Sequence, residues 1–269
     1  MAKPLEAIDV HAHVGRYRQV PSSELLEALC SGDVDVILAR ARRAHTRLTI
    51  VSPMEGLLPR GSSDPVSANV SAAGIVARTD GLMHWVIVDP LKPETFEQAS
   101  DMLSGPKCAG MKIHPEEHVY PIAEHAEAIF RFAADRRAVV QSHSGEQNSM
   151  PEEFVRFADR YPEVTLILSH LGCGWDSDLS HQVRAVQASR AGNVYTDTSS
   201  AKSITSGLLE WAVKQVGASR ILYGTDSPLY FAPMQRARVD CAEISDADRR
   251  LILKDNALRI FKNLQSERR

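Results

Sequence analysis

The sequence contains no long hydrophobic run. No segment approaches the roughly 18 consecutive apolar residues that a membrane-spanning helix needs, and the first twenty residues lack the apolar stretch of a secretory signal peptide. We therefore expect a cytoplasmic protein that does not insert into a membrane.

Cysteine is scarce and scattered. The chain has four cysteines, and no two of them have the CxxC spacing that metal cages and redox motifs use: Cys30, Cys108, Cys173 and Cys241. This spacing argues against a disulfide framework and against a cysteine zinc cage. Reduced thiols fit the expected cytoplasmic location.

The sequence has no large excess of positive or negative charge. The formal net charge is -3 among 269 residues, so neither nucleic acid nor an anionic lipid surface is expected as a partner. Apolar residues make up 43% of the chain and charged residues 24%, which is ordinary for a globular protein. The expected partner is a small-molecule substrate.

Eight short apolar segments are present, and most of them stop at a polar or turn-forming residue. Several are rich in β-branched residues without clean alternation, which is typical of parallel strands buried on both faces. The predicted strands are Ala7–His13, Leu48–Pro53, Met83–Pro90, Ala109–Pro115, Ala138–Ser144, Val164–Leu171, Asn193–Ser199 and Ile221–Asp226.

Segments with helical periodicity separate these strands. One of them places Ile122, Ala126, Ile129 and Phe130 along a single stripe, and another opens with Pro151. The alternation predicts an α/β fold, a single (β/α)8 TIM barrel that spans residues 1–269. A doubly wound open sheet is the alternative, but no strong glycine-rich phosphate loop near the first strand supports it.

Two irregular stretches, 53–64 and 172–178, follow predicted strand ends. Barrel enzymes build their sites on that face, so both are candidate substrate loops.

His11-Ala-His13 closes the first predicted strand. Residues i and i+2 of a strand point to the same side, so both imidazoles can reach one metal ion. Taken alone, such a pair is as consistent with two hydrogen-bonded structural histidines as it is with a metal site. Three later apolar segments, however, end in His143, His170 and Asp226, and five such side chains can converge if the strands are neighbours in one barrel.

Six motifs occur in order along nearly the whole chain: Ile8-Asp-Val-His-Ala-His13, Gly110-Met-Lys-Ile-His-Pro115, His143-Ser-Gly145, Ser169-His-Leu-Gly172, Asn193-Val-Tyr-Thr-Asp-Thr198 and Tyr223-Gly-Thr-Asp-Ser-Pro228. Together they resemble the amidohydrolase superfamily, and most of all its amidohydrolase-related branch, which includes the aminocarboxymuconate-semialdehyde decarboxylase group. The closing segment 255–261 resembles the last helix of that branch.

The resemblance implies a metal site and the roles around it. His11, His13, His143 and Asp226 match the metal ligands, and His170 matches a catalytic histidine that binds a second metal in binuclear members. The implied cofactor is a divalent metal, zinc first, with manganese or iron as alternatives. Metal-bound water would have its pKa lowered toward roughly 7, Asp226 would take its proton, and His170 would polarise the substrate.

Three cationic or imidazole side chains are candidates for substrate binding. Lys112 and His114 share one side of the fourth predicted strand, and Arg16 follows the first strand directly. Lys112 has three interpretations: a carboxylated lysine that bridges two metals, an unmodified cation that holds a substrate carboxylate or orients His114, or a core lysine paired with a carboxylate such as Asp197. Arg16 would recognise an anionic substrate through its guanidinium, or it is a solvated loop residue.

The main functional hypothesis is a metal-dependent hydrolase that attacks the carbonyl of a small, carboxylate-bearing lactone, amide or cyclic imide. The alternative is non-oxidative decarboxylation of an unsaturated or aromatic acid at the same site. The chain is short for the decarboxylase group, which favours hydrolysis weakly. A non-catalytic metal- or ligand-binding barrel is a third hypothesis, and a homodimer is left open.

Overall fold

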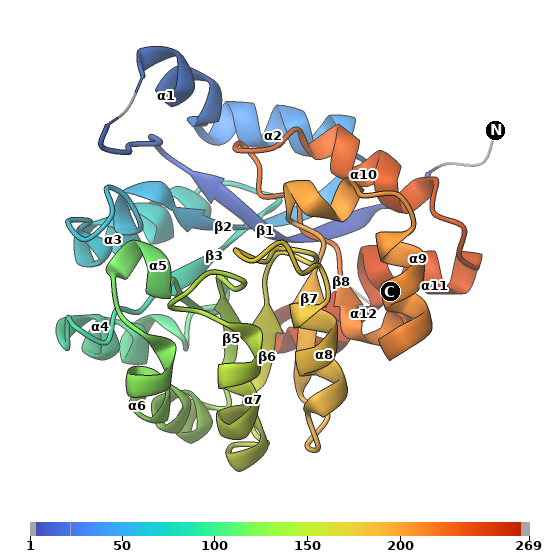
Figure 1. Cartoon of the computed structure of the whole chain (residues 1–269). Coiled ribbons are helices and arrows are strands. Elements are labelled where there is room, and N and C mark those ends of the chain that lie inside the picture. The colour runs from blue at the N-terminus through green and yellow to red at the C-terminus, as the bar shows by residue number, and fades with distance from the viewer. Residues whose placement is uncertain (1–3, 22, 265–269) are drawn as a thin grey trace.

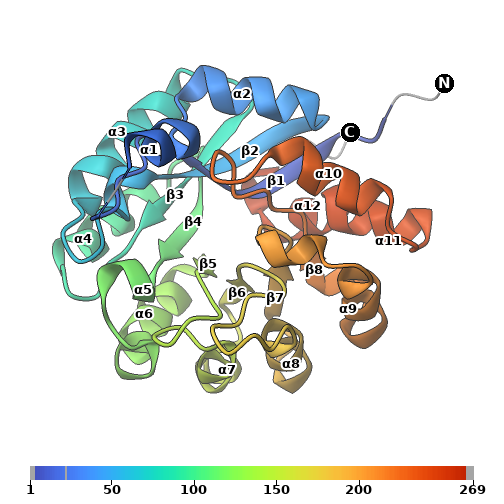
Figure 2. The ribbon, with the colours of Figure 1, turned by 45° about the horizontal axis from the view of Figure 1, so that its top comes forward.

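Eight parallel strands form the centre of the molecule, and the helices surround them (Figures 1 and 2). The computed structural model describes residues 4–21 and 23–264. The strands pair in chain order: β1 (Ala7–Val14), β2 (Thr46–Pro53), β3 (Leu82–Ile87), β4 (Cys108–Ile113), β5 (Val139–Ser142), β6 (Thr165–Leu168), β7 (Val194–Asp197) and β8 (Ile221–Leu222). This confirms the predicted single (β/α)8 barrel.

Helices follow the strands and cover the outside of the barrel. The α-helices are α1 (Glu24–Cys30), α2 (Val34–Arg43), α3 (Pro65–Ala77), α4 (Glu94–Met102), α5 (Pro115–His118), α6 (Ile122–Arg136), α7 (Pro151–Arg160), α8 (His181–Ala188), α9 (Leu208–Val216), α10 (Ala232–Asp240), α11 (Asp246–Arg250) and α12 (Asn256–Ile260). Short turns are η1 (Met54–Gly56), η2 (Ala201–Ile204), η3 (Ala218–Arg220) and the π-helical η4 (Leu251–Asp255).

The seam between the last strand and the first closes the ring. The backbone N–H of Val10 donates to the carbonyl oxygen of Tyr223 over 2.9 Å, and Ala12 forms a parallel bridge with Ser227. The seam therefore brings the end of β1 directly beside the segment that follows β8.

All eight predicted strands lie where the apolar segments indicate, but most are shorter at their carboxyl ends. The predicted segments that end at Ser144, Leu171 and Asp226 leave the sheet at Ser142, Leu168 and Leu222. The polar residues at the ends of these segments are therefore loop residues at the mouth of the barrel, where functional side chains of this fold are placed.

The predicted helical stripe is buried as expected. Ile122, Ala126, Ile129 and Phe130 of α6 all pack into the layer between sheet and helices. In Figure 2 the helices form a ring outside the strands.

A tryptophan fills the interior of the barrel. The Trp85 ring is fully buried, its Nε1 donates to the carbonyl oxygen of Val10 over 3.0 Å, and it packs edge-on against Phe261. Gly110 on β4 makes room for it, because a Cβ there would lie 2.3 Å from the carbonyl oxygen of Val139 and 2.9 Å from the Trp85 ring. The barrel is thus a packed core below the site.

The loop after β1 is closed at its base. The backbones of Gly15 and Gly32 exchange two hydrogen bonds of 2.8 and 3.0 Å, so residues 16–31 leave and re-enter the barrel at one point. A side chain at Gly15 would collide with the Glu55 carboxylate, which a Cβ would approach to 2.2 Å. This close approach fixes the position from which the loop reaches over the barrel mouth.

No helix in the part of the chain that the structure describes is long and apolar enough to cross a membrane. The four cysteines are free thiols.

Candidate metal and substrate site

Two histidines of β1 and the aspartate after β8 meet at the carboxyl end of the barrel. The Nε2 of His13 lies 2.9 Å from Oδ1 of Asp226, and the Nε2 of His11 lies 3.4 Å from the same oxygen. Ligand atoms of all three residues lie within 4.8 Å of one another. The seam between β1 and β8 is what joins residues more than 200 positions apart.

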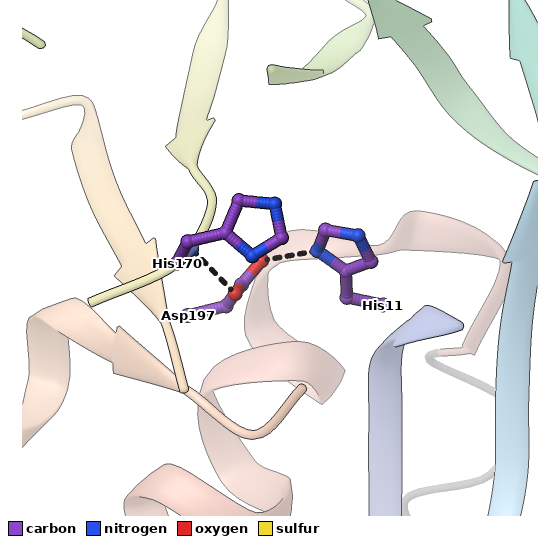
Figure 3. Close-up of side chains that lie close together, drawn as sticks. All are labelled: His11, His170 and Asp197. Carbon is purple, nitrogen blue, oxygen red and sulfur yellow. Dashed lines mark hydrogen bonds and ion pairs between the residues drawn. The ribbon is translucent and has the colours of Figure 1, made fainter. Parts of the chain in front are cut away.

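A second carboxylate, Asp197 at the end of β7, lies between His11 and His170 (Figure 3). The Nδ1 of His11 lies 3.1 Å from Oδ2 of Asp197, and the backbone N–H of His170 donates to Oδ1 over 3.1 Å. Ser199 donates its hydroxyl proton to Asp197 and lies 2.9 Å from the Nδ1 of His170. Because the serine proton is used on Asp197, Ser199 accepts from the Nδ1–H of His170, which leaves the His170 Nε2 with a lone pair.

Local backbone irregularities aim these side chains. The register between β1 and β2 shifts between Asp9 and Ala12, next to His11. His170 and Asp226 have φ angles of 72° and 54°, in the left-handed region that residues other than glycine seldom adopt. Asp9 accepts hydrogen bonds from the N–H groups of His11 and Thr225, and so ties β1 to the turn before Asp226. The segments after β6 and β8 are thus bent at their functional residues.

Burial sets the charge of the imidazoles. Burial and the nearby Lys112 ammonium lower the pKa of His11 to about 4, and burial together with His143 lowers the pKa of His170 well below its ordinary value. Burial alone would raise the pKa of Asp226, but the hydrogen bond from His13 and the nearby imidazoles outweigh it and lower that pKa. At neutral pH the His11 and His170 imidazoles are therefore neutral and the Asp226 carboxylate is ionised, which are the forms that bind metal ions.

This donor set fits a divalent metal. Two imidazole nitrogens directed at one carboxylate oxygen form a two-histidine, one-carboxylate arrangement, which suits zinc, manganese and iron. The carboxylate of Asp197 on the far ring nitrogen of His11 supplies the orienting hydrogen bond that metal-binding histidines commonly have.

His143, the fourth residue that the sequence indicates as a ligand, lies at the same cavity but outside this group of three. Its Nε2 lies 2.5 Å from a carboxylate oxygen of Glu146, its ring stacks on that of His114 at 4.2 Å, and the ring centre of His170 is 4.8 Å away. Glu146 was not singled out in the sequence.

Lys112 is fully buried beneath the histidines. Its Nζ lies 3.3 Å from Nε2 of His11 and donates to Oε1 of Gln141 over 3.1 Å, and Gln141 in turn donates to Asp197. Burial lowers the pKa of Lys112 to about 8. The Lys112 ammonium therefore lies against Nε2 of His11, the nitrogen that would hold the metal.

The other two candidates for substrate binding differ in position. His114 borders the cavity, and its Nδ1 accepts from the backbone N–H of Glu117 over 3.3 Å. Arg16 extends to Glu27 of α1 with 63% of its side chain exposed, and it is not among the described residues that line the cavity.

The cavity above the cluster has an imidazole floor and mostly apolar walls. Both candidate substrate loops contribute to it: Met54, Leu57 and Leu58 from stretch 53–64, and Cys173 from stretch 172–178. The walls are completed by Leu229, the hydroxyl-bearing Tyr17, Tyr230 and Ser200, the amide-bearing Gln19, and Glu117. Sequence reasoning missed Glu117, since it lies on a single-turn helix whose position depends on the β2–α3 loop.

Several solved structures share this fold. A 2,6-dihydroxybenzoate decarboxylase from Rhizobium aligns with a TM-score of 0.72 at 15% identity, over 96% of this chain and 98% of that chain. A dihydroxybenzoic acid decarboxylase from a Polaromonas species, with bound manganese and the inhibitor 2-nitroresorcinol, aligns with a TM-score of 0.72 at 15% identity over 97% of both chains. A 5-carboxyvanillate decarboxylase from Novosphingobium aromaticivorans, complexed with manganese and 4-hydroxy-3-methoxy-5-nitrobenzoic acid, gives 0.69 at 14% identity over 96% of both.

The expectation of hydrolysis as the main reaction was wrong. The three similar structures described above are decarboxylases of aromatic acids, which match the alternative reaction instead. The argument from chain length does not hold, because the alignments span nearly the full length of those decarboxylases. This chain is therefore not short for that group. The predicted set of metal ligands does not distinguish hydrolysis from decarboxylation, because one metal site can polarise either a carbonyl or a carboxylate.

The chain matches none of the curated proteins with which it was compared. The model of the amidohydrolase family matches residues 8–262, nearly the whole chain. With the barrel and the order of its motifs, this match shows that the chain belongs to the amidohydrolase family.

Proposed function

We propose that this protein is a metal-dependent decarboxylase of small aromatic or unsaturated carboxylic acids. The observation that carries the proposal is the cluster of His11, His13 and Asp226 at the base of a cavity with apolar walls. The likeness to aromatic-acid decarboxylases supports it, since two of them are described with bound manganese.

The metal would be held by His11, His13 and Asp226, with His143 as the fourth ligand that the family resemblance implies. When bound there, a divalent ion supplies positive charge that orients and polarises the substrate carboxylate. Asp197 keeps the Nε2 of His11 free of a proton by accepting from Nδ1, so this ring is ready to act as a ligand.

The apolar walls favour loss of the carboxylate. Met54, Leu57, Leu58 and Leu229 would pack against the substrate ring and exclude water from it. A carboxylate that has lost its hydration is destabilised relative to neutral carbon dioxide, so the cavity disfavours the charged ground state more than the product.

A proton must replace the carbon dioxide on the ring. His170 borders the cavity, and its Nδ1–H is used on Ser199, so its Nε2 is the atom that can carry this proton. An anionic substrate nearby raises the low pKa of His170 and loads Nε2 with a proton. That proton passes to the ring carbon that bears the carboxylate; the carbon–carbon bond then breaks, its electron pair returns to the ring, and carbon dioxide leaves.

The test measures carbon dioxide release from 2,6-dihydroxybenzoate and salicylate. We expect release by protein loaded with Mn²⁺ or Zn²⁺, loss after chelation, and recovery when the metal is restored. His11→Ala should lose both metal and activity. His170→Asn should retain its metal while kcat falls by about 10²- to 10⁴-fold.

His125→Asn is the matched control, because His125 lies on α6 and packs edge-on against Tyr120, away from the cluster. Binding of metal without turnover of any aromatic or unsaturated acid would favour the non-catalytic barrel. Full activity of the metal-free protein would contradict the proposal. The choice between manganese and zinc, the cytoplasmic location and a homodimer stay predictions.

A further inference from the structure

An ion pair borders the substrate cavity away from the metal cluster. Glu117 on α5 lines the cavity with 11% of its side chain exposed. Arg60, from the loop after β2, donates from Nε to Oε2 over 3.3 Å and from Nη2 to Oε1 over 3.2 Å. Arg60 is 53% exposed and is not among the described cavity-lining residues, whereas Glu117 lines the cavity and its carboxylate acts electrostatically on the cavity-lining Tyr17.

The backbone fixes this arrangement from both sides. The N–H of Gly61 donates to the carbonyl oxygen of Glu117 over 2.7 Å, and the N–H of Glu117 donates to the Nδ1 of His114. The loop that carries Arg60 and the helix that carries Glu117 are therefore held together through main-chain bonds. The position of the carboxylate does not depend on the ion pair alone.

The described lining of the cavity offers no cation to a second anionic group. None of its described lining residues is lysine or arginine. Arg16 forms an ion pair with Glu27, and Lys112 is fully buried against His11 and Gln141. Away from the metal cluster, the polar lining consists of neutral groups such as Gln19 and Tyr230, together with the negative Glu117.

The Tyr17 phenol lies at a place in the cavity where negative charge is disfavoured. Burial, then the nearby Cys30 thiol, then the carboxylates of Glu117 and Asp226 raise the pKa of its phenol. All of these effects disfavour negative charge at that place. A second carboxylate on a substrate that reached Tyr17 would meet the same burial and the same repulsion from Glu117.

We propose that Glu117 is a specificity-determining residue that selects acids with a single carboxylate and favours ring substituents that donate hydrogen bonds. The inference rests on the proposed function, because it assigns the one accepted carboxylate to the metal cluster. A hydroxyl or amino substituent can donate to Glu117, whereas a carboxylate in its place can only repel it. Arg60 moderates this selection by neutralising part of the Glu117 charge.

The test compares ligands that differ only in one substituent. Salicylates that carry either a hydroxyl or a carboxylate at ring position 3, 4 or 5 are titrated into Mn²⁺-loaded protein by calorimetry. The ratio of the Kd of the carboxylate form to that of the hydroxyl form measures selection. We expect a ratio of about tenfold or more at the position that faces Glu117, as repulsion between close charges produces.

Two variants should move this ratio in opposite directions. Glu117→Gln removes the repulsion and frees Arg60, so the ratio should fall to about one or below. Arg60→Met leaves the carboxylate uncompensated, so the ratio should rise by about threefold. Glu127→Gln and Arg160→Met are the matched controls, since they form an exposed ion pair of the same kind between α6 and α7. Melting temperatures establish that each variant is folded.

A ratio near one at all three positions in the unmodified protein would overturn the inference, and so would an unchanged ratio in folded Glu117→Gln. Carbon dioxide release is measured separately on the same acids. Selection without any carbon dioxide would contradict the proposed reaction and leave the role of Glu117 standing. Carbon dioxide release without selection would contradict only the role of Glu117.

Discussion

Asp197 connects both sides of the candidate site through its two oxygens. One oxygen lies beside the ring nitrogen of His11 and accepts from Gln141, and the other accepts from Ser199 and from the backbone of His170. These contacts set the tautomer of His11 and, through Ser199, that of His170. A single buried carboxylate thus prepares one ring as a ligand and the other as a proton carrier.

Replacing Asp197 by Asn should weaken metal binding without removing a ligand. The amide can also offer its NH2 group to His11, which disfavours the Nδ1–H tautomer that leaves Nε2 free. We expect the Kd for Mn²⁺ or Zn²⁺, measured by competition with a chelator, to rise by about 10- to 100-fold.

Asp101→Asn, on the exposed face of α4, is the control for the change of charge. An unchanged Kd in a folded Asp197→Asn protein would mean that Asp197 does not orient His11.

The site residues at the ends of apolar strands could be predicted from the sequence. The side chains that form hydrogen bonds with them could not. His11, His13 and Asp226 stand at the ends of apolar segments, and that position predicts that they meet at the barrel mouth. Ser199 meets His170 where two loops approach, and Glu146 meets His143 through the turn after β5. No period in the sequence encodes either contact. Arg16 shows the converse: adjacency in sequence placed it near the site, but Glu27 turns its side chain outward.

At the scale of elements, a paired salt bridge joins α9 to α10. Arg238 donates to both carboxylate oxygens of Glu210, and the backbone N–H of Glu243 adds a third bond of 3.1 Å. The hydrogen bonds from Arg238 lower the pKa of Glu210 to about 2. The folded state therefore releases this proton more readily than the unfolded chain.

The sign of the effect follows from proton binding. The unfolded state binds the proton between the ordinary pKa near 4.5 and the folded value near 2, so the stabilisation is complete above pH 4.5 and is lost as the pH falls toward 2. We expect Glu210→Gln to lower the free energy of unfolding at pH 7 by about 1–2 kcal/mol, a value reduced for partial exposure.

Urea unfolding at pH 7, 5, 4 and 3.5 measures this difference. The gap between Glu210→Gln and the unmodified protein should narrow as the pH falls below 4.5. A gap that stays constant would show that the ion pair does not contribute through charge.

Apolar segments located every strand, but not where each strand stops. β8 is only Ile221–Leu222, because the chain leaves the sheet to form the turn that carries Asp226. Similarly, the helical pattern that begins at Asp246 is one run that contains the π-helical turn η4 between α11 and α12. Such endings are set by tertiary contacts, which local sequence patterns do not report.

For the whole molecule, Arg236 on α10 secures the region where the barrel closes. Its buried guanidinium donates to the carbonyl oxygens of Leu5 and Ala44 over 2.8 and 3.0 Å, and its Nε donates to Asp240. One side chain therefore links the start of β1, the junction of α2 with β2, and the helix after β8. In Figure 1, α10 lies beside α2 and β1.

Arg236→Met should weaken the contact between β1 and β8 where the barrel closes. Buried carbonyl oxygens lose their donors, so we expect the free energy of unfolding to fall by about 2–4 kcal/mol. Hydrogen exchange should speed up at Val10, whose N–H donates across the seam, more than at β4 and β5.

Arg160→Met, which removes an exposed partner of Glu127, should change the free energy of unfolding by less than about 0.5 kcal/mol. Uniform acceleration of exchange across all strands in Arg236→Met would indicate a global effect rather than a local one at the seam.

The fold of the whole chain was predictable and its reaction was not. Alternating strands and helices predict a barrel regardless of the reaction that the barrel catalyses. The pattern of ligand residues predicts only that a metal can bind. Neither pattern describes the walls above that cluster, where Leu57, Leu58 and Glu117 come from loops and a short helix. These walls became visible only once the loops were placed in space.

The paired backbones of Gly15 and Gly32 carry a consequence for engineering. Because the segment between Gly15 and Gly32 begins and ends at one pair of backbone hydrogen bonds, it can be exchanged as one cassette, provided that Arg16 keeps its backbone bond to Glu55 and Tyr17 its packing against Leu57 and Leu58. Tyr17 and Gln19 from this segment line the cavity. Libraries confined to the cassette could therefore redirect the choice of acid while the metal cluster stays as it is.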